Sequence, residues 1–120
     1  MTADHYEAPE SLFAAYYKER SGGSVLEAPC VGFVAYRVIP GTTEAFIDEI
    51  YIAPEHRMTG SGSALLNEVA EKVKALGMKH LTCSISPAAR NSSQALAAAI
   101  QYGFKLHSTG VNEVFLMKEI

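Results

Sequence analysis

The 120-residue sequence has no long apolar run, no excess of basic residues and only two cysteines. Without about 18 consecutive apolar residues it offers no candidate membrane-spanning helix. No secretory leader is recognisable, so we expect a soluble, intracellular protein in the cytoplasm. The net charge of −3 argues against a general nucleic-acid binder, which needs a basic face to neutralise phosphates. We expect Cys30 and Cys83 to be small buried residues in a reducing compartment, with no disulfide scaffold.

Motifs of several catalytic classes are missing as well. The four histidines are scattered without metal-ligand spacing, so we expect no metal site. There is no Gly-x-Ser-x-Gly sequence, which would mark the nucleophile of a serine hydrolase. The glycines at 60 and 62 are followed neither by a Lys-Ser/Thr pair nor by a third glycine at the required spacing. This excludes the P-loop and the dinucleotide-binding fingerprint.

The composition is that of a chain that folds around a core, because 48% of the residues are hydrophobic and 19% are charged. We therefore expect one domain over residues 1–120, of which residues 1–8 form a loose tail. Periodicity and turn residues predict helices and strands in the order α-β-β-β-α-β-α-β-β, at 9–20, 24–28, 31–39, 44–52, 61–76, 79–86, 91–102, 104–107 and 111–117. This order predicts an α/β (α+β) sandwich with a mixed, mostly antiparallel sheet.

Three segments carry the side chains that matter most. In the first helix we expect an apolar face of Leu12, Phe13, Tyr16 and Tyr17, with the two tyrosines packing in the core or lining a pocket. In the long helix we expect burial of Leu65, Val69, Val73 and Leu76. In the strand at 44–52, alternation puts Phe46, Asp48, Ile50 and Ile52 on one face and Ile47, Glu49 and Tyr51 on the other. Because both faces carry apolar residues, this strand is predicted to be central.

The most informative stretch follows that central strand. The strand stops at Pro54, a short loop reads Arg57-Met-Thr-Gly60-Ser-Gly62, and a helical pattern begins at about Ser61. The first N–H groups of a helix have no partner inside it, and the helix dipole leaves partial positive charge there. Glycine lets a ligand approach the main chain closely. The stretch therefore predicts an anion-binding loop.

The Arg-x-x-Gly-x-Gly sequence lies between this strand and an amphipathic helix, and a strand, a helix and Gly103-Phe104 follow. In this order of elements, the sequence resembles the pyrophosphate loop of the GNAT family of acetyl-coenzyme A-dependent N-acetyltransferases. The resemblance covers about residues 31–120. It implies a three-layer sandwich whose two central parallel strands splay apart and hold coenzyme A in the wedge. The customary first strand has no counterpart before Pro9, and one of the two usual early helices is absent, which leaves the wall of the acceptor site undefined.

The resemblance also implies the cofactor contacts. Main-chain N–H groups of the loop would hold the pyrophosphate, at Met58, Thr59, Gly60, Ser61, Gly62 and Ser63. Arg57 would close the loop or touch a phosphate, and the backbone near Ile50 and Ile52 would pair with the pantetheine arm like an added strand. Asn91 matches an asparagine that the family often has at the start of the next helix. It would either bond the cofactor or act as an N-cap.

The catalytic residues are implied by position. Glu49 is the first choice for the general base and would need a pKa raised by partial burial, and Asp48 is the second choice. Alternatively, one or both are solvated or paired with Arg37. Many family members carry a tyrosine four residues before the Gly-Phe pair as general acid, but Ala99 stands there and Tyr102 faces elsewhere. Water, Ser92, Tyr51 or another group would then protonate the leaving thiolate, or the protein is a poor catalyst.

Taken together, the sequence predicts an N-acetyltransferase that moves an acetyl group from acetyl-CoA to a primary amine, either a small molecule or a protein amine, by direct attack. The alternative is a non-catalytic coenzyme A-binding or interaction module with the same fold. The expected partners are acetyl-CoA and an amine acceptor, with no nucleic acid, no membrane and no metal. The sequence leaves open a homodimer.

Overall fold

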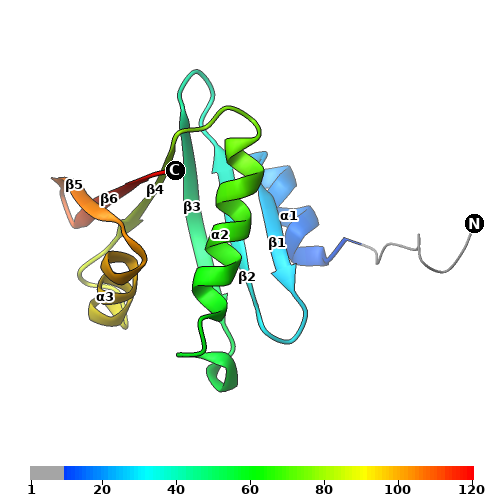
Figure 1. Cartoon of the computed structure of the whole chain (residues 1–120), viewed down its shortest axis with the longest axis horizontal. Coiled ribbons are helices and arrows are strands. Elements are labelled where there is room, and N and C mark those ends of the chain that lie inside the picture. Colours follow the sequence, from blue (N-terminus) through cyan, green and yellow to red (C-terminus); the bar gives the residue numbers. More distant parts are fainter. Residues whose placement is uncertain (1–9) are drawn as a thin grey trace, which may run out of the picture.

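The computed structural model describes residues 10–120, so the expectations for the tail and for a helix start at Pro9 lie outside the described residues. The described elements follow the predicted order (Figure 1). They are α1 (Leu12–Ser21), β1 (Ser24–Ala28), β2 (Gly32–Val38), β3 (Glu44–Ile52), the 3-10 turn η2 (Pro54–His56), α2 (Ser61–Lys74), β4 (His80–Ile85), α3 (Ser92–Tyr102), β5 (Lys105–Gly110) and β6 (Glu113–Glu119).

The strands of the described region form one sheet in the order β1-β2-β3-β4-β6-β5. Neighbouring strands are antiparallel except β3 and β4, which run parallel. Figure 1 shows α2 and α3 in front of the sheet and α1 behind it. The predicted three-layer sandwich with a mixed, mostly antiparallel sheet is therefore confirmed.

The core lies between α2 and the sheet. Leu65, Leu66, Val69 and Val73 recur on one side of α2 and are buried against the strands, together with Val34, Ala45, Ile47, Leu81, Phe104 and Leu116. Burying one such aliphatic side chain stabilises the fold by about 1.5–3 kcal/mol. The expected burial of Leu76 is wrong, because α2 ends at Lys74 and Leu76 lies in the following turn with 68% of its surface exposed.

Helix α1 begins later than its sequence pattern suggests. The Ser11 hydroxyl oxygen accepts a hydrogen bond from the Ala14 N–H at 3.0 Å and caps the helix, which makes Leu12 its first residue. Ala14 is the residue that is buried, whereas Leu12 is 90% and Tyr16 57% exposed, so the predicted apolar face is only partly correct. Tyr16 lies under the Arg20 guanidinium and does not pack in the core.

A β-bulge in β3 changes which side chains share a face. Tyr36 on β2 pairs with Ile47 and Ala35 pairs with Glu49, so Asp48 is an extra residue without a partner. Ile47 and, past the bulge, Ile50 and Ile52 all face α2. The prediction that side chains alternate regularly along the whole strand is therefore wrong. Asp48 and Glu49 both lie on the α1 face, as does Tyr51.

The two central strands separate after four residue pairs. β3 and β4 are paired from Glu44–His80 to Ile47–Cys83, and beyond this point β3 continues to Ile52 and β4 to Ile85 without pairing to each other. We call the space between residues 48–52 and residues 84–85 the wedge. The splayed strands that the resemblance implies are confirmed.

The cysteines differ from each other. Cys83 lies on β4 against the core, where burial raises the pKa of its thiol to about 11. The expectation of burial is wrong for Cys30, which is exposed in the turn between β1 and β2 with a left-handed φ of 65°. Within residues 10–120 no three His, Cys, Asp or Glu side chains cluster as metal ligands would. None of the helices described there has the length and apolar character to cross a bilayer.

Candidate active site

The loop after β3 is shaped to present main-chain N–H groups. Met58 and Gly60 take left-handed φ angles of 61° and 86°, which turn the chain into α2. The first helical hydrogen bond runs from the Ala64 N–H to the Gly60 carbonyl at 3.0 Å, so the N–H groups of residues 61–63 precede the helical ladder. No side chain caps this helix start. Such amides, together with the positive end of the helix dipole, are the features with which a helix start can bind an anion.

Gly62 has no internal reason to be glycine. It is helical, and a Cβ built there would lie 3.7 Å from Ile52 Cγ1 and 3.9 Å from Ile50 Cδ1, which is ordinary contact. Gly32 is the opposite case, because a Cβ there would come within 2.1 Å of the Tyr51 carbonyl oxygen. The fold itself therefore does not require glycine at position 62, and the bare main chain there leaves room for a ligand to approach closely.

The edge of β3 that borders the wedge carries free main-chain groups and a closing arginine. The Ala53 N–H donates to the Val31 carbonyl on the β2 side at 2.7 Å, so the Ile52 carbonyl in the same peptide points into the wedge. Alternation along the strand directs the main-chain groups of Ile50 the same way. Arg57 Nε donates to the Ile52 carbonyl at 2.9 Å, and its guanidinium lies over the Tyr51 ring. This bond fits the expected role of Arg57 in closing the loop, and its expected contact with a phosphate stays a prediction.

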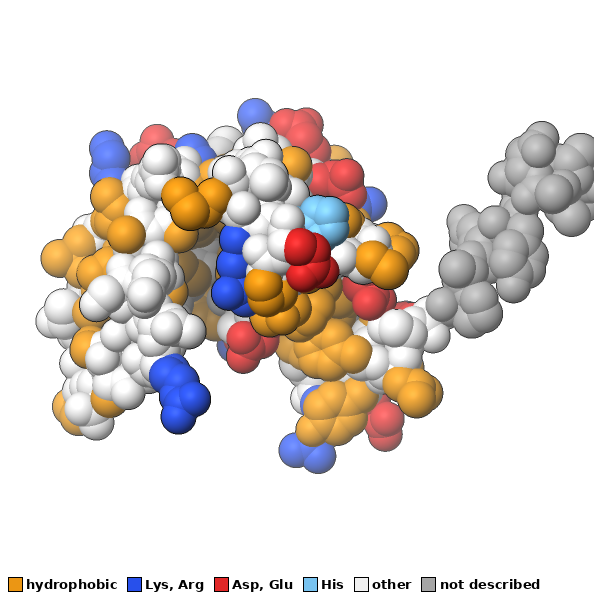
Figure 2. Space-filling view, turned by 90° about the horizontal axis from the view of Figure 1, so that it is seen from below, with side chains coloured by type: hydrophobic (Ala, Val, Ile, Leu, Met, Phe, Trp, Pro, Cys, Tyr) orange, Lys and Arg blue, Asp and Glu red, His pale blue; other side chains and the backbone are white. Residues whose placement is uncertain are grey.

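The surface is hollowed at this end of the molecule. Seen from the end that carries the loop, a hollow separates the half with α3 and β4–β6 from the half with α1, α2 and β1–β3 (Figure 2). Hydrophobic side chains gather on the wall that belongs to the second half. The loop, the open edge of β3 and the α1 face of the sheet meet around this hollow.

The two adjacent carboxylates have different surroundings. Asp48 accepts hydrogen bonds from the Tyr17 hydroxyl and from Arg37 Nε, the latter at 3.0 Å. Glu49 is exposed. The ion pair found among residues 10–120 joins Arg37 to Asp48 and does not include Glu49. The partial burial expected for Glu49 is therefore wrong, because β4 has already left β3 at this position. Asp48 is held in a structural network, whereas Glu49 is available to a ligand.

The contribution of Tyr17 was missed at the sequence level, where it was weighed only as a packing or pocket residue. Its spacing from Phe13, one helical turn earlier, is the signal that both face the sheet. Burial raises the pKa of Tyr17 to about 12, and its hydrogen bond to the Asp48 carboxylate adds to this effect. Tyr17 thereby ties α1 to the bulge.

This raised pKa predicts a pH-dependent contribution to stability. Because the folded pKa of Tyr17 lies above the unfolded value of 10.0, its contribution is complete below pH 10 and is lost as the pH rises through about 12. Solvent screening of a part-buried group reduces the effect to roughly 1 kcal/mol. We expect the Tyr17→Phe variant to lose less stability than the wild type between pH 9 and 11.5, measured by urea denaturation. Equal losses in the two proteins would contradict the assignment.

The region around α3 offers no tyrosine for a general acid. Ala99 and Tyr102 both pack against the core cluster, and the Tyr102 hydroxyl donates to Asn67 Oδ1 on α2 at 2.7 Å, so this hydroxyl is already engaged. The Ser92 hydroxyl donates to the Pro87 carbonyl at 3.0 Å. Asn91 precedes α3 in a left-handed conformation, and its side chain makes no capping bond. The N-cap reading of Asn91 is therefore not supported, and its amide is available to a ligand.

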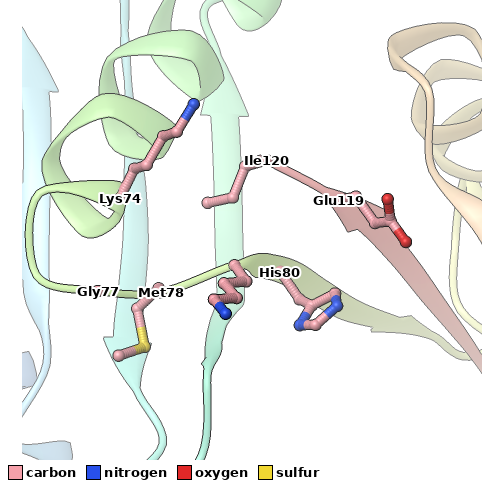
Figure 3. A pocket seen from close by; sticks show the side chains of 7 residues that line it. Lys74, Gly77, Met78, His80, Glu119 and Ile120 are labelled. Atoms are coloured by element: carbon pink, nitrogen blue, oxygen red, sulfur yellow. The ribbon is translucent and has the colours of Figure 1, made fainter.

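A second depression lies at the other end of the sheet. It has a volume of about 540 Å³ and is lined by Lys74, Gly77, Met78, Lys79, His80, Glu119 and Ile120 (Figure 3). It adjoins the C-terminal end of α2, whereas the anion loop is at the N-terminal end. A helix of 14 residues separates the two by roughly 20 Å. This depression is therefore not part of the candidate active site.

Comparisons with known proteins agree with this geometry. The family described as "Acetyltransferase (GNAT) family" matches residues 2–104. Comparison with curated proteins gives no match. Similar solved structures include the PaiA N-acetyltransferase of Thermoplasma acidophilum in complex with coenzyme A, with 20% identity and a TM-score of 0.69 over 86% of this chain and 65% of that one. The chain thus spans less than two thirds of that protein.

Two further structures are similar over more of their length. A GNAT family acetyltransferase from Elizabethkingia anophelis with acetyl-CoA bound has 17% identity and a TM-score of 0.69, over 92% of this chain and 84% of that one. The IAA acetyltransferase of Bacillus cereus has 19% identity and a TM-score of 0.68, over 93% and 86%. At these identities the structures establish a shared fold.

Proposed function

Because the chain belongs to the acetyltransferase (GNAT) family, we propose that it transfers the acetyl group of acetyl-CoA to a primary amine. The observation that carries the proposal is the start of α2, where unpaired amides surround a glycine that the fold itself does not require. Residues 58–63 hold the pyrophosphate there, and Asn91 lies at the start of the next helix as a further contact. The open edge of β3 at Ile50 pairs with the pantetheine arm in the wedge.

Glu49 is the general base in this proposal. It lies on the open α1 face just past the point where the strands separate, and it is free of the ion pair that occupies Asp48. An amine must be neutral to attack, so a nearby carboxylate assists by removing its proton, directly or through a water molecule. When bound, acetyl-CoA supplies an activated thioester. The new carbon–nitrogen bond forms as the carbon–sulfur bond breaks, and the thiolate takes a proton from water or from the Tyr51 hydroxyl, since the Ser92 hydroxyl is engaged by the Pro87 carbonyl.

The direct test of cofactor binding is a thermal-shift titration with acetyl-CoA. A ligand that binds only the folded state raises its stability, by about 2.7 kcal/mol at one hundred times the dissociation constant. For a chain of this size we expect the melting temperature to rise by roughly 10 °C. Desulfo-coenzyme A, which lacks the sulfur but keeps the pyrophosphate, should give a similar shift. No shift at millimolar acetyl-CoA would refute the proposal.

A non-catalytic coenzyme A-binding module is the second candidate, and the alanine at position 99 favours it. The two candidates separate in a thiol-release assay over a panel of amines. Release above the rate without protein supports the transferase. A thermal shift without release supports the binding module. A cytoplasmic location, a homodimer and the absence of nucleic-acid and membrane partners stay predictions.

A further inference from the structure

Three aromatic rings form a continuous surface on the α1 face of the sheet. Phe13 on α1, Phe33 on β2 and Tyr51 on β3 follow one another with ring centroids 5.0 Å and 6.0 Å apart. We call these three residues the aromatic wall. Aromatic side chains usually bury most of their surface, yet Phe13 is 37% and Tyr51 47% exposed. An open row of rings of this kind marks a binding surface.

The aromatic wall ends beside the proposed general base. Glu49 and Tyr51 are two residues apart on the same face of β3, and their partners on β2 are Ala35 and Phe33. Residues two apart on a strand are separated by about 7 Å. Ala35 is completely buried and adds no bulk between the carboxylate and the rings. A molecule whose amino group meets Glu49 therefore rests its remaining atoms on the rings of Tyr51 and Phe33.

The charges around the aromatic wall restrict what can lie on it. Asp48 is occupied by Arg37 and Tyr17, so Glu49 is the carboxylate left for an ammonium group. The Arg57 guanidinium lies 5.7 Å from the centre of the Tyr51 ring, and the Arg37 guanidinium lies 5.1 Å from that of Phe46 on the same face. A second positive charge on the ligand would therefore approach fixed cations. The aromatic wall accepts an apolar body with one amino group.

We infer that the acceptor is an arylalkylamine, a monoamine whose aromatic ring stacks on the aromatic wall while its amino group lies at Glu49. This rests on the proposed function for the reaction itself. The spacing along β3 fits a linker of about two to four carbons between nitrogen and ring. Aliphatic monoamines lack the ring, and diamines bring a second charge toward the arginines.

The test uses 2-phenylethylamine, n-butylamine and 1,4-diaminobutane with the full chain. Thiol release gives kcat and KM, and a thermal shift of the protein saturated with coenzyme A gives amine binding without turnover. We expect 2-phenylethylamine to have at least a tenfold higher kcat/KM than either other amine, mainly through a lower KM. Tyr51→Leu and Phe33→Leu should reduce this preference about tenfold. Tyr16→Leu, which removes an exposed ring of α1 outside the aromatic wall, should keep it.

The outcomes separate this inference from the proposed function. Turnover of all three amines at similar kcat/KM, or a preference that survives Tyr51→Leu, would overturn the inference and leave the proposed function standing. No turnover of any amine would count against the proposed function, and the binding measurement then decides the inference. Selective binding of 2-phenylethylamine that is lost in Tyr51→Leu would support it, and no selective binding would overturn it. Tyr51 is half-exposed, so this variant is expected to fold.

Discussion

Replacing Gly62 with alanine is expected to weaken acetyl-CoA binding by at least tenfold without harming the fold. The added methyl group has room inside the protein, at 3.7 Å from Ile52 and 3.9 Å from Ile50, but it occupies the approach to the amides that start α2. A tenfold loss corresponds to about 1.4 kcal/mol. Gly62→Val should lose more, because its two further methyl groups extend into the same approach. Isothermal titration calorimetry with acetyl-CoA measures the affinity, and thermal melting without ligand checks the fold.

Gly77→Ala is the matched control at the other end of α2. Its φ of 93° is left-handed, so alanine is strained there and the melting temperature should fall, by the equivalent of about 1 kcal/mol. Its affinity for acetyl-CoA should stay within about twofold of the wild type. If Gly62→Ala keeps full affinity, the pyrophosphate does not lie against this part of the loop.

The second large effect is expected for Glu49→Gln, with kcat/KM lowered by roughly a hundredfold. Glutamine keeps the shape of the side chain but cannot take a proton, so only the amine that is already neutral in solution reacts. The rate should then rise more steeply with pH than in the wild type. Affinity for acetyl-CoA should be unchanged, since the side chain lies on the α1 face of β3 and not in the loop. Initial rates from pH 6 to 9.5 provide the measurement.

Two other carboxylates serve as comparisons for Glu49. Glu113→Gln changes an exposed acid on β6 away from the site and should leave the pH profile as it is. Asp48→Asn breaks the contact with Arg37 and should lower the melting temperature more than it changes the slope of the profile. A wild-type profile in Glu49→Gln, or a steepened one in Asp48→Asn alone, would reassign the base.

The features that follow from neighbouring residues were predictable from the sequence. The stop at Pro54, the glycines of the loop and the apolar repeat Leu65, Val69, Val73 are local, and together they predicted β3, the loop after it and α2 correctly. The divergence of β3 and β4 came from the family resemblance, because nothing local in either strand requires it. That Ala99 stands where the family often has a tyrosine stays a prediction from the resemblance.

The errors arose where a side chain's position depends on the rest of the fold. Leu12 and Leu76 fit the apolar repeats of their helices, but Leu12 opens α1 and Leu76 lies beyond the end of α2, so neither reaches the sheet. Cys30 sits in an apolar stretch that becomes a turn. The bulge in β3 is set by pairing with β2, and strict alternation along β3 cannot reveal it. That error assigned Asp48 and Glu49 to opposite faces.

Asp48, the extra residue of the bulge in β3, shifts the alternation of side chains between the two faces of the strand by one residue. Ahead of it, odd-numbered side chains such as Ala45 and Ile47 face α2; after it, the even-numbered Ile50 and Ile52 do so. Were β3 regular through Asp48, with no bulge, everything downstream would exchange sides: Glu49 would lie under α2 and the isoleucines would lie beside Phe33. The one extra residue in β3 thus decides which of the following side chains lie on the open α1 face, and it is the reason that Glu49 is available there to a substrate.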